Sequence, residues 1–181
     1  MLYVIGGVPH SGKSKLAARL NRNFGYSVFT TDALIAAFMV AAPKANINFA
    51  YPRSKNKFAS ALTVVVRQLL RSNRHYVLEG EILTPSLIEP LWQYTKIRDV
   101  YLGLSDPDID AVIKFETSDG GWVHRMSKNY QKSLSSALVA RNEELEAECE
   151  EYGAQYFDMS DGSYRKQAKL AYEYLVGWGS L

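Results

Sequence analysis

Short apolar runs alternate along this chain with longer segments in which apolar residues recur at helical spacing. The runs cover residues 2–5, 27–30, 76–78, 100–104 and 155–157. Runs of this length, bounded by polar or turn-forming residues, are typical of buried strands. Strands that alternate with helices form a parallel sheet with helices on both faces. The pattern therefore predicts a three-layer α/β/α fold.

The helical segments include one clear end and one ambiguous member. Gly25 follows the first helical segment and is predicted to end it in a left-handed conformation. Residues 62–70 contain three consecutive valines, which favour a strand. The apolar residues Phe58, Ala61 and Leu62 nevertheless extend a helical spacing through this segment. We therefore predict a helix there.

Two stretches interrupt the alternation of strands and helices. Residues 43–57 form a long connection between two predicted helices, and connections of that length are usually functional or disordered. Phe49 and Tyr51 argue against disorder. Residues 116–125 follow the fourth predicted strand and include Gly120-Gly121, a candidate hinge for a lid. Because the chain has no repeat, low-complexity segment or linker, we expect a single domain over residues 1–181.

The segment between the first strand and the first helix matches the phosphate-binding pattern G-x-x-x-x-G-K-[ST] at every fixed position. Glycines let backbone N–H groups surround a phosphate, and the helix N-terminus adds partial positive charge. Lys13 is expected to reach the β- and γ-phosphates, and Ser14 to offer its hydroxyl to Mg²⁺. A chance glycine-rich turn is the alternative, but it does not explain why strand, loop and helix are all in register. The loop residues are Gly7, Val8, Pro9, His10, Ser11, Gly12, Lys13 and Ser14.

Composition narrows the class of protein further. The formal net charge of +2 gives no global indication of a nucleic-acid or membrane partner. The single cysteine, Cys149, excludes an intramolecular disulfide and a cysteine-based zinc site, and the three histidines lack metal-ligand spacing. No apolar run reaches the roughly 18–20 residues of a membrane span, and the first residues do not resemble a signal peptide. We expect a cytoplasmic protein, monomeric or homodimeric.

Over its full length the chain resembles the small P-loop kinases. This group includes the adenylate, shikimate and gluconate kinases, the antibiotic phosphotransferases and the 2-phosphoglycerate kinase-like proteins. Besides the loop, the resemblance rests on Thr31-Asp32, Leu78-Glu79-Gly80, an arginine-bearing lid and residues 158–163. It implies a five-stranded parallel sheet in the order 2-3-1-4-5, an acceptor-binding helical insertion at about 33–75 and a lid at about 116–134. It also implies ATP and Mg²⁺ as cofactors.

Acidic residues at the predicted strand ends are the candidates for acceptor and metal chemistry. Asp32 is expected to act as the base on the acceptor hydroxyl, or else to cap the helix that follows it. A carboxylate near phosphates repels them unless a cation intervenes, which makes Glu79 a candidate for Mg²⁺ and acceptor binding. Many P-loop proteins have an aspartate in that place. Glu81 is expected either to reach an acceptor hydroxyl or to be a surface charge.

Three arginines are candidates for contacts with anions. Arg141 lies in the middle of an apolar helical stripe, where it is expected to bind a phosphate or substrate or to form a structural salt bridge. Arg125 and Lys128, in the predicted lid, are candidates for closing over the γ-phosphate or for a solvated charged face. Arg53 lies in the basic connection at 43–57, where either an anionic acceptor or an ordinary basic loop explains the charge.

The segment after the fifth strand is expected to lie beside the adenine. Its candidate contacts are Ser160, Asp161 and Gly162, largely through the backbone. Tyr164 either stacks on the base or packs against a helix.

These residues together predict a phosphotransferase that moves the γ-phosphate of MgATP to a small-molecule hydroxyl acceptor. A nucleoside or nucleotide kinase is one alternative. The chain lacks the arginine pattern that nucleoside monophosphate kinases use around the acceptor phosphate, which counts against this alternative. GTPase switch and base-reading motifs are also missing. A nucleotide-binding regulatory protein without turnover is the other alternative, but such a protein needs no carboxylate beside the γ-phosphate.

Overall fold

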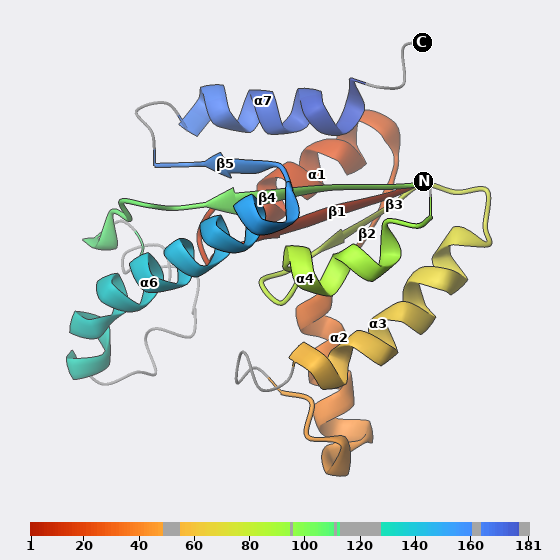
Figure 1. Cartoon of the computed structure of the whole chain (residues 1–181), viewed down its shortest axis with the longest axis horizontal. Helices are drawn as coiled ribbons and strands as arrows, with labels where there is room; N and C mark the ends of the chain where they lie inside the picture. Colours follow the sequence, from red (N-terminus) through yellow and green to blue (C-terminus); the bar gives the residue numbers. More distant parts are fainter. Residues whose placement is uncertain (49–54, 95, 111, 113–127, 161–163, 178–181) are drawn as a thin grey trace.

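A central sheet of five parallel strands organises the protein. The computed structural model describes residues 1–48, 55–94, 96–110, 112, 128–160 and 164–177. The sheet has the order β2-β3-β1-β4-β5 (Figure 1), which confirms the predicted order. Its strands are β1 (Leu2–Gly7), β2 (Ser27–Thr30), β3 (Tyr76–Glu79), β4 (Ile97–Gly103) and β5 (Tyr156–Asp158).

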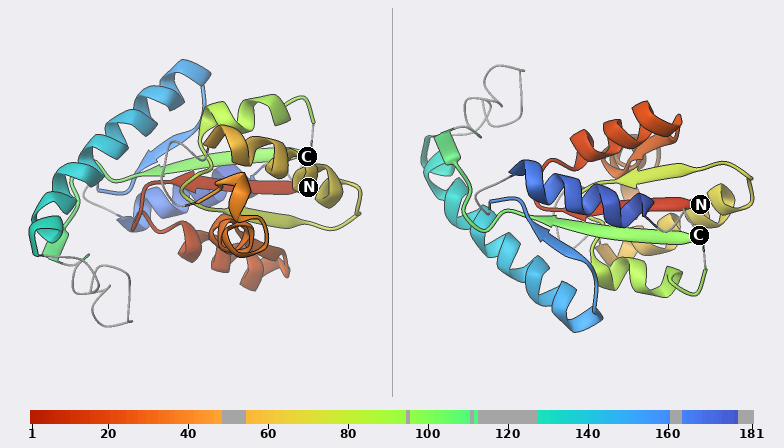
Figure 2. Two further views of the ribbon diagram at one scale, coloured as in Figure 1. Left: turned by 90° about the horizontal axis from the view of Figure 1, so that it is seen from below. Right: turned by 90° about the horizontal axis from the view of Figure 1, so that it is seen from above.

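Helices cover both faces of this sheet, so the predicted three layers are confirmed. Helices α1 (Lys13–Phe24) and α7 (Tyr164–Val176) lie on one face (Figure 1). Helix α6 (Lys128–Tyr152) runs along the other face beside β4 and β5 (Figure 2). The remaining helices lie on the α6 face: α2 (Thr31–Ala41), η1 (Pro43–Ala45), α3 (Lys55–Leu70), α4 (Pro85–Ile88) and η2 (Glu89–Leu91).

The period-two alternation of β1 explains how one strand serves two cores. Tyr3 and Ile5 pack with α1 and α7, whereas Leu2 and Val4 pack with α2, α3 and α4. All four side chains are at most 5% exposed. A parallel strand buried on both faces must be apolar at every position. The unbroken apolar run at the start of the chain therefore reflects its central place in the sheet.

Two local predictions are confirmed and several boundaries are corrected. Gly25 ends α1 with φ 69°, and its N–H donates to the carbonyl of Asn21. The valine-rich segment is part of the helix α3. That helix begins at Lys55, so the predicted connection at 43–57 is shorter than expected. Likewise, α6 begins at Lys128, inside the predicted lid. The rest of the lid, at 116–127, lies outside the described residues.

Strand β4 begins three residues earlier than predicted. Ile97, Arg98 and Asp99 are only partly buried and two of them are charged, which hid the strand from the hydrophobic pattern. Strand β5 is also one residue later than expected. In the described part of the chain, no helix is long and apolar enough to cross a membrane.

Candidate active site

The phosphate loop connects the carboxyl end of β1 to the start of α1. Gly12 is the residue just before α1 and has φ 93°, a conformation that L side chains rarely adopt. A Cβ at Gly12 would also lie 2.4 Å from the hydroxyl oxygen of Tyr164. Ser11 closes the turn, because its hydroxyl donates to the Val8 carbonyl at 2.8 Å. The loop therefore has the geometry that the sequence pattern predicts.

Lys13 places a buried cation inside this loop. Its side chain is 9% exposed, and Nζ donates to the Val8 carbonyl oxygen at 2.7 Å. Burial lowers the pKa of Lys13. The carboxylates of Glu81, Glu79 and Asp32 oppose that shift, so all three lie close enough to interact with the ammonium group. The structure thus brings the lysine and the three predicted acidic residues together.

Ser14 and Glu79 meet across the gap between α1 and β3. The Ser14 hydroxyl donates to Oε2 of Glu79 at 3.1 Å, and Glu79 is 7% exposed. Ile5 of β1 is in register with Glu79 of β3, which aligns the carboxyl ends of the two strands. A hydroxyl and a carboxylate are the oxygen ligands that Mg²⁺ takes beside substrate phosphates and water. The pair therefore fits a Mg²⁺ site that a nucleotide would complete.

Among the described residues, no cluster of three or more His, Cys, Asp or Glu side chains could hold a metal by itself.

Asp32 lies in the first turn of α2 and does not cap that helix. The cap is Thr30, whose Oγ1 accepts from the Asp32 backbone N–H at 3.3 Å. The capping alternative for the Asp32 side chain is therefore wrong. Thr30 is paired with Glu79 in the register of β2 and β3. Asp32 thus lies two residues after the end of β2, beside the Ser14–Glu79 pair, and its residue is exposed.

Arg141 reaches from α6 to two carboxylates. Its Nη1 lies 3.0 Å from Oε2 of Glu144, and its Nε lies 3.7 Å from Oε1 of Glu81. Burial raises the pKa of Glu81, while the charges of Lys13 and Arg141 oppose the rise. The sequence left open whether Arg141 forms a structural salt bridge or binds a phosphate or substrate, and the structure contains the salt bridges. Its contact with a phosphate remains a prediction.

A cavity of about 320 Å³ lies between the phosphate loop, α1 and α7. Tyr164 lines it, and the Lys15 ammonium lies 5.4 Å from the centre of that ring. The other lining residues are Gly12, Lys15, Leu16, Arg19, Leu102, Met159, Arg165 and Ala168. The cavity is on the side where we predict the adenine.

Ser160 takes part in a network that fastens the end of β4 to the end of β5. Its Oγ accepts from the Asp106 N–H at 2.9 Å, and its own N–H donates to Asp158 at 2.9 Å. The side chain of Asp158 also accepts from both the N–H and the hydroxyl of Ser105. These bonds show that the Ser160 side chain is a structural connector.

Asn142 is a buried polar residue that sequence reasoning missed. It is 1% exposed, and its Oδ1 accepts from the Leu104 N–H at 2.6 Å and from the Tyr156 hydroxyl at 2.9 Å. The bonds fix α6 against β4 and β5, one residue after Arg141. The sequence signal that could have identified Asn142 is its position on α6 next to the apolar stripe, where a polar side chain is buried only if it is hydrogen-bonded.

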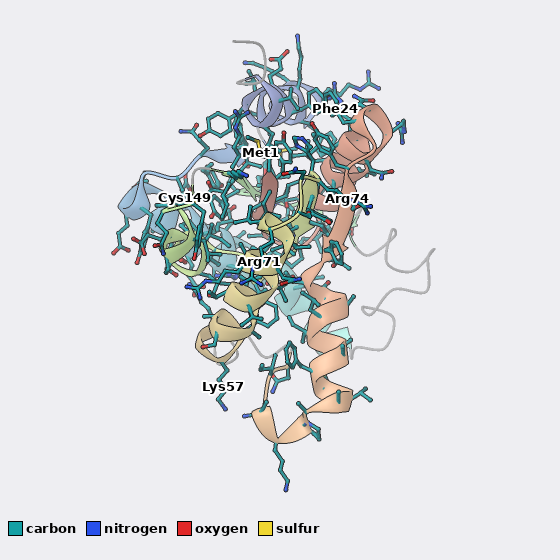
Figure 3. All side chains as sticks on the ribbon, turned by 90° about the vertical axis from the view of Figure 1, so that its right-hand side faces the viewer. Met1, Phe24, Lys57, Arg71, Arg74 and Cys149 are labelled. Atoms are coloured by element: carbon teal, nitrogen blue, oxygen red, sulfur yellow. The ribbon has the colours of Figure 1, made fainter. Side chains whose placement is uncertain are left out.

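Two basic residues of the predicted connection, Lys55 and Lys57, lie in the first turn of α3. The Lys55 ammonium lies 2.9 Å from the Glu148 carboxylate of α6. Lys57 extends away from the sheet at the outer end of α3 (Figure 3). Four other predicted site residues, Arg53, Arg125, Asp161 and Gly162, lie outside the described residues.

The parallel sheet with a phosphate loop between β1 and α1 defines a P-loop NTPase fold. Residues 2–150 match the family described as an AAA domain, and the chain belongs to that family. No curated protein sequence matches the chain.

Solved structures share this fold at low sequence identity. A sugar kinase from Janibacter sp. has a TM-score of 0.59 and 18% identity, covering 96% of this chain and 93% of its own. A gluconokinase from Sinorhizobium meliloti has a TM-score of 0.56 and 19% identity, covering 99% and 97%. A shikimate kinase from Acinetobacter baumannii in complex with shikimate has a TM-score of 0.55 and 18% identity, covering 99% and 94%.

Proposed function

We propose that the protein is an ATP-dependent phosphotransferase that moves the γ-phosphoryl group of MgATP to a hydroxyl of a small metabolite. The observation that carries this proposal is the convergence of Lys13, Asp32 and the Ser14–Glu79 pair at the carboxyl ends of adjacent strands. In open α/β sheets, ligands bind at that edge. The names of the similar structures, which include three kinases, support the same reaction class.

Each residue has a distinct role in the proposed reaction. Lys13 offsets negative charge on the β- and γ-phosphates, where charge spreads over the oxygens in the transition state. Ser14 and Glu79 hold Mg²⁺, which supplies further charge neutralisation when bound. Asp32 orients the acceptor hydroxyl and accepts its proton as the oxygen attacks the γ-phosphorus. The exposed position of Asp32 leaves its carboxylate accessible to a small molecule.

A regulatory protein that only binds ATP would need the phosphate loop but not Asp32.

An ATP-dependent enzyme of this kind belongs in the cytoplasm, and a single cysteine suits that reducing compartment.

The test is transfer from MgATP to pooled neutral sugars, sugar acids, glycerates and nucleosides, followed by ADP release and by ³¹P NMR of the product. We expect one pool to raise ADP release at least about tenfold above the rate with water alone, with a new phosphate ester. Lys13→Ala serves as the inactive control. ATP binding without transfer to any pool would favour the regulatory alternative, and a phosphorylated nucleoside would favour the nucleoside-kinase alternative.

A further inference from the structure

The corner of the site between β3, α2 and α6 is assembled from charges that already face one another. Glu81 follows β3 by two residues, and its side chain is 39% exposed. Its Oε1 faces the Arg141 guanidinium, which also contacts Glu144. Asp32, on α2, directly follows Thr31, whose hydroxyl oxygen faces Gly80, so Asp32 lies beside the segment that carries Glu81. Two carboxylates therefore contact the Arg141 guanidinium, and a third, that of Asp32, lies on the neighbouring helix.

The charge of this corner decides which acceptors it can hold. Lys13 is directed to the phosphates and Glu79 to the metal, so neither defines the acceptor end. Among the described residues, the rest of the corner carries the positive charge of Arg141 and the negative charges of Glu81, Glu144 and Asp32. An acceptor carboxylate or phosphate placed here would have to displace Glu81 or Glu144 from Arg141. Juxtaposed like charges oppose binding and so exclude partners of the wrong charge.

A second observation at the same corner points to hydrogen-bonding groups. Thr31 is completely buried, and its hydroxyl has no hydrogen-bond partner among the described residues. The oxygen faces Gly80, lying 1.7 Å from where a Cβ of that residue would be. Gly80 separates Glu79 from Glu81. The corner therefore has carboxylate oxygens on Glu81 and Asp32 and, beneath them, a buried hydroxyl that has no partner among the described residues.

We propose that Glu81 determines acceptor specificity: it occupies Arg141 and selects an uncharged polyhydroxy acceptor, bound through its hydroxyl donors, over an acceptor that carries a carboxylate or phosphate. This inference rests on the proposed phosphotransferase activity. A free oxygen of the Glu81 carboxylate accepts from one hydroxyl of the acceptor while Asp32 accepts from the hydroxyl that is phosphorylated. A carboxylate that accepts a hydrogen bond from the substrate discriminates strongly, because a substrate without the matching hydroxyl leaves the carboxylate oxygen unsatisfied.

The test uses neutral sugars and the sugar acids derived from them by oxidation, which differ only in a carboxylate. We expect kcat/KM of the wild-type protein to be at least about tenfold higher for the neutral member of the best pair. Glu81→Gln together with Glu144→Gln removes the negative charges of the two carboxylates that contact Arg141 among the described residues, and we expect this variant to narrow or reverse the preference by about tenfold or more. The single variant Glu81→Gln should have a smaller effect in the same direction.

Glu143→Gln is the matched control, because it removes the same charge from α6 at an exposed residue beside the ion pair. It should leave the preference unchanged. Thermal melting of each variant establishes that the protein is folded, and Glu81→Asp keeps the charge if the amide variant unfolds.

The possible failures are distinguishable. Transfer to no acceptor overturns the phosphotransferase proposal and this inference with it. Transfer that favours the sugar acid in the wild-type protein overturns only the role of Glu81, and so does a double variant that keeps the wild-type preference.

Discussion

The phosphate side and the acceptor side of the candidate site are built in different ways. Lys13 and Ser14 belong to one continuous loop of eight residues, in which the backbone supplies much of the geometry. On the acceptor side, Asp32, Glu81 and Arg141 come from α2, the segment after β3 and α6. The phosphate side is therefore specified locally, whereas the acceptor side exists only when three distant segments pack correctly.

This difference means that the acceptor half of the site can change its charge while the phosphate half stays the same. The phosphates of a nucleotide are the same whatever the acceptor, so one short motif can specify that half of the site. The acceptor half is held by side-chain contacts, such as those of Arg141 with Glu81 and Glu144. A few substitutions there change the charge of the corner without disturbing the loop.

The largest expected effect tests the phosphate side. Lys13→Ala removes the cation at the transferring phosphate, and we expect turnover to fall by about 10²-fold or more. The thermal melting temperature should change little by comparison, because the lysine makes a single backbone bond in the loop. Steady-state kinetics and melting measure both. Near-normal turnover would remove the basis of the proposed reaction.

The second prediction separates the two sides at Asp32. Asp32→Asn keeps the shape but removes the base, so kcat should fall by about 10²-fold. ATP affinity should stay within a few-fold, because Asp32 acts on the acceptor and not on the nucleotide. Titration calorimetry with an ATP analogue, beside the kinetics, checks this. An equal loss of ATP affinity would place Asp32 on the phosphate side.

The third prediction concerns the contacts that hold α6 in place. Asn142→Ala leaves the Leu104 N–H and the Tyr156 hydroxyl without their acceptor. Unsatisfied buried donors are costly, so the free energy of unfolding should drop by about 2 kcal/mol. Urea unfolding measures it. Tyr156→Phe removes one of the two donors and should cost less; if it costs more than Asn142→Ala, the bonds of Asn142 are not the main restraint.

The smallest expected effect concerns Glu148, which joins α6 to α3 and α4. Burial by itself raises the pKa of Glu148, but hydrogen bonds from Ser86, Lys55 and Thr84 outweigh it and lower the pKa to about 2. A carboxyl with a folded pKa below its unfolded value of about 4.3 stabilises the fold above that pH. This contribution is lost as the pH falls from about 4.3 towards 2.

Glu148→Gln should therefore lower the free energy of unfolding at pH 7 by about 1 kcal/mol and have less effect near pH 3. Urea unfolding at the two pH values tests this. Glu151→Gln, at an exposed residue of the same helix, is the control and should show no such pH dependence. An identical cost at both pH values would assign the effect of Glu148 to packing.

Sequence alone determined the sheet, its order through the resemblance, and the phosphate loop. The sheet and the loop rest on local rules: the alternation of strands and helices, the spacing of Gly7, Gly12 and Lys13, and the glycine that ends α1. The order of the strands was implied only by the resemblance to the small P-loop kinases. The boundary of β4 was predicted less well, because charged residues within the strand broke the apolar pattern.

Only the tertiary structure decided what the charged residues face. Sequence identified Asp32, Glu81 and Arg141 as candidates but left a second interpretation open for each. Packing brought Arg141 of α6 against Glu81, which follows β3 sixty residues earlier in the chain. It also gave Asn142 its buried role, for which α6, β4 and β5 must meet. The physical reason is that an ion pair or buried hydrogen bond depends on the separation of side chains in space, which spacing along the chain does not determine.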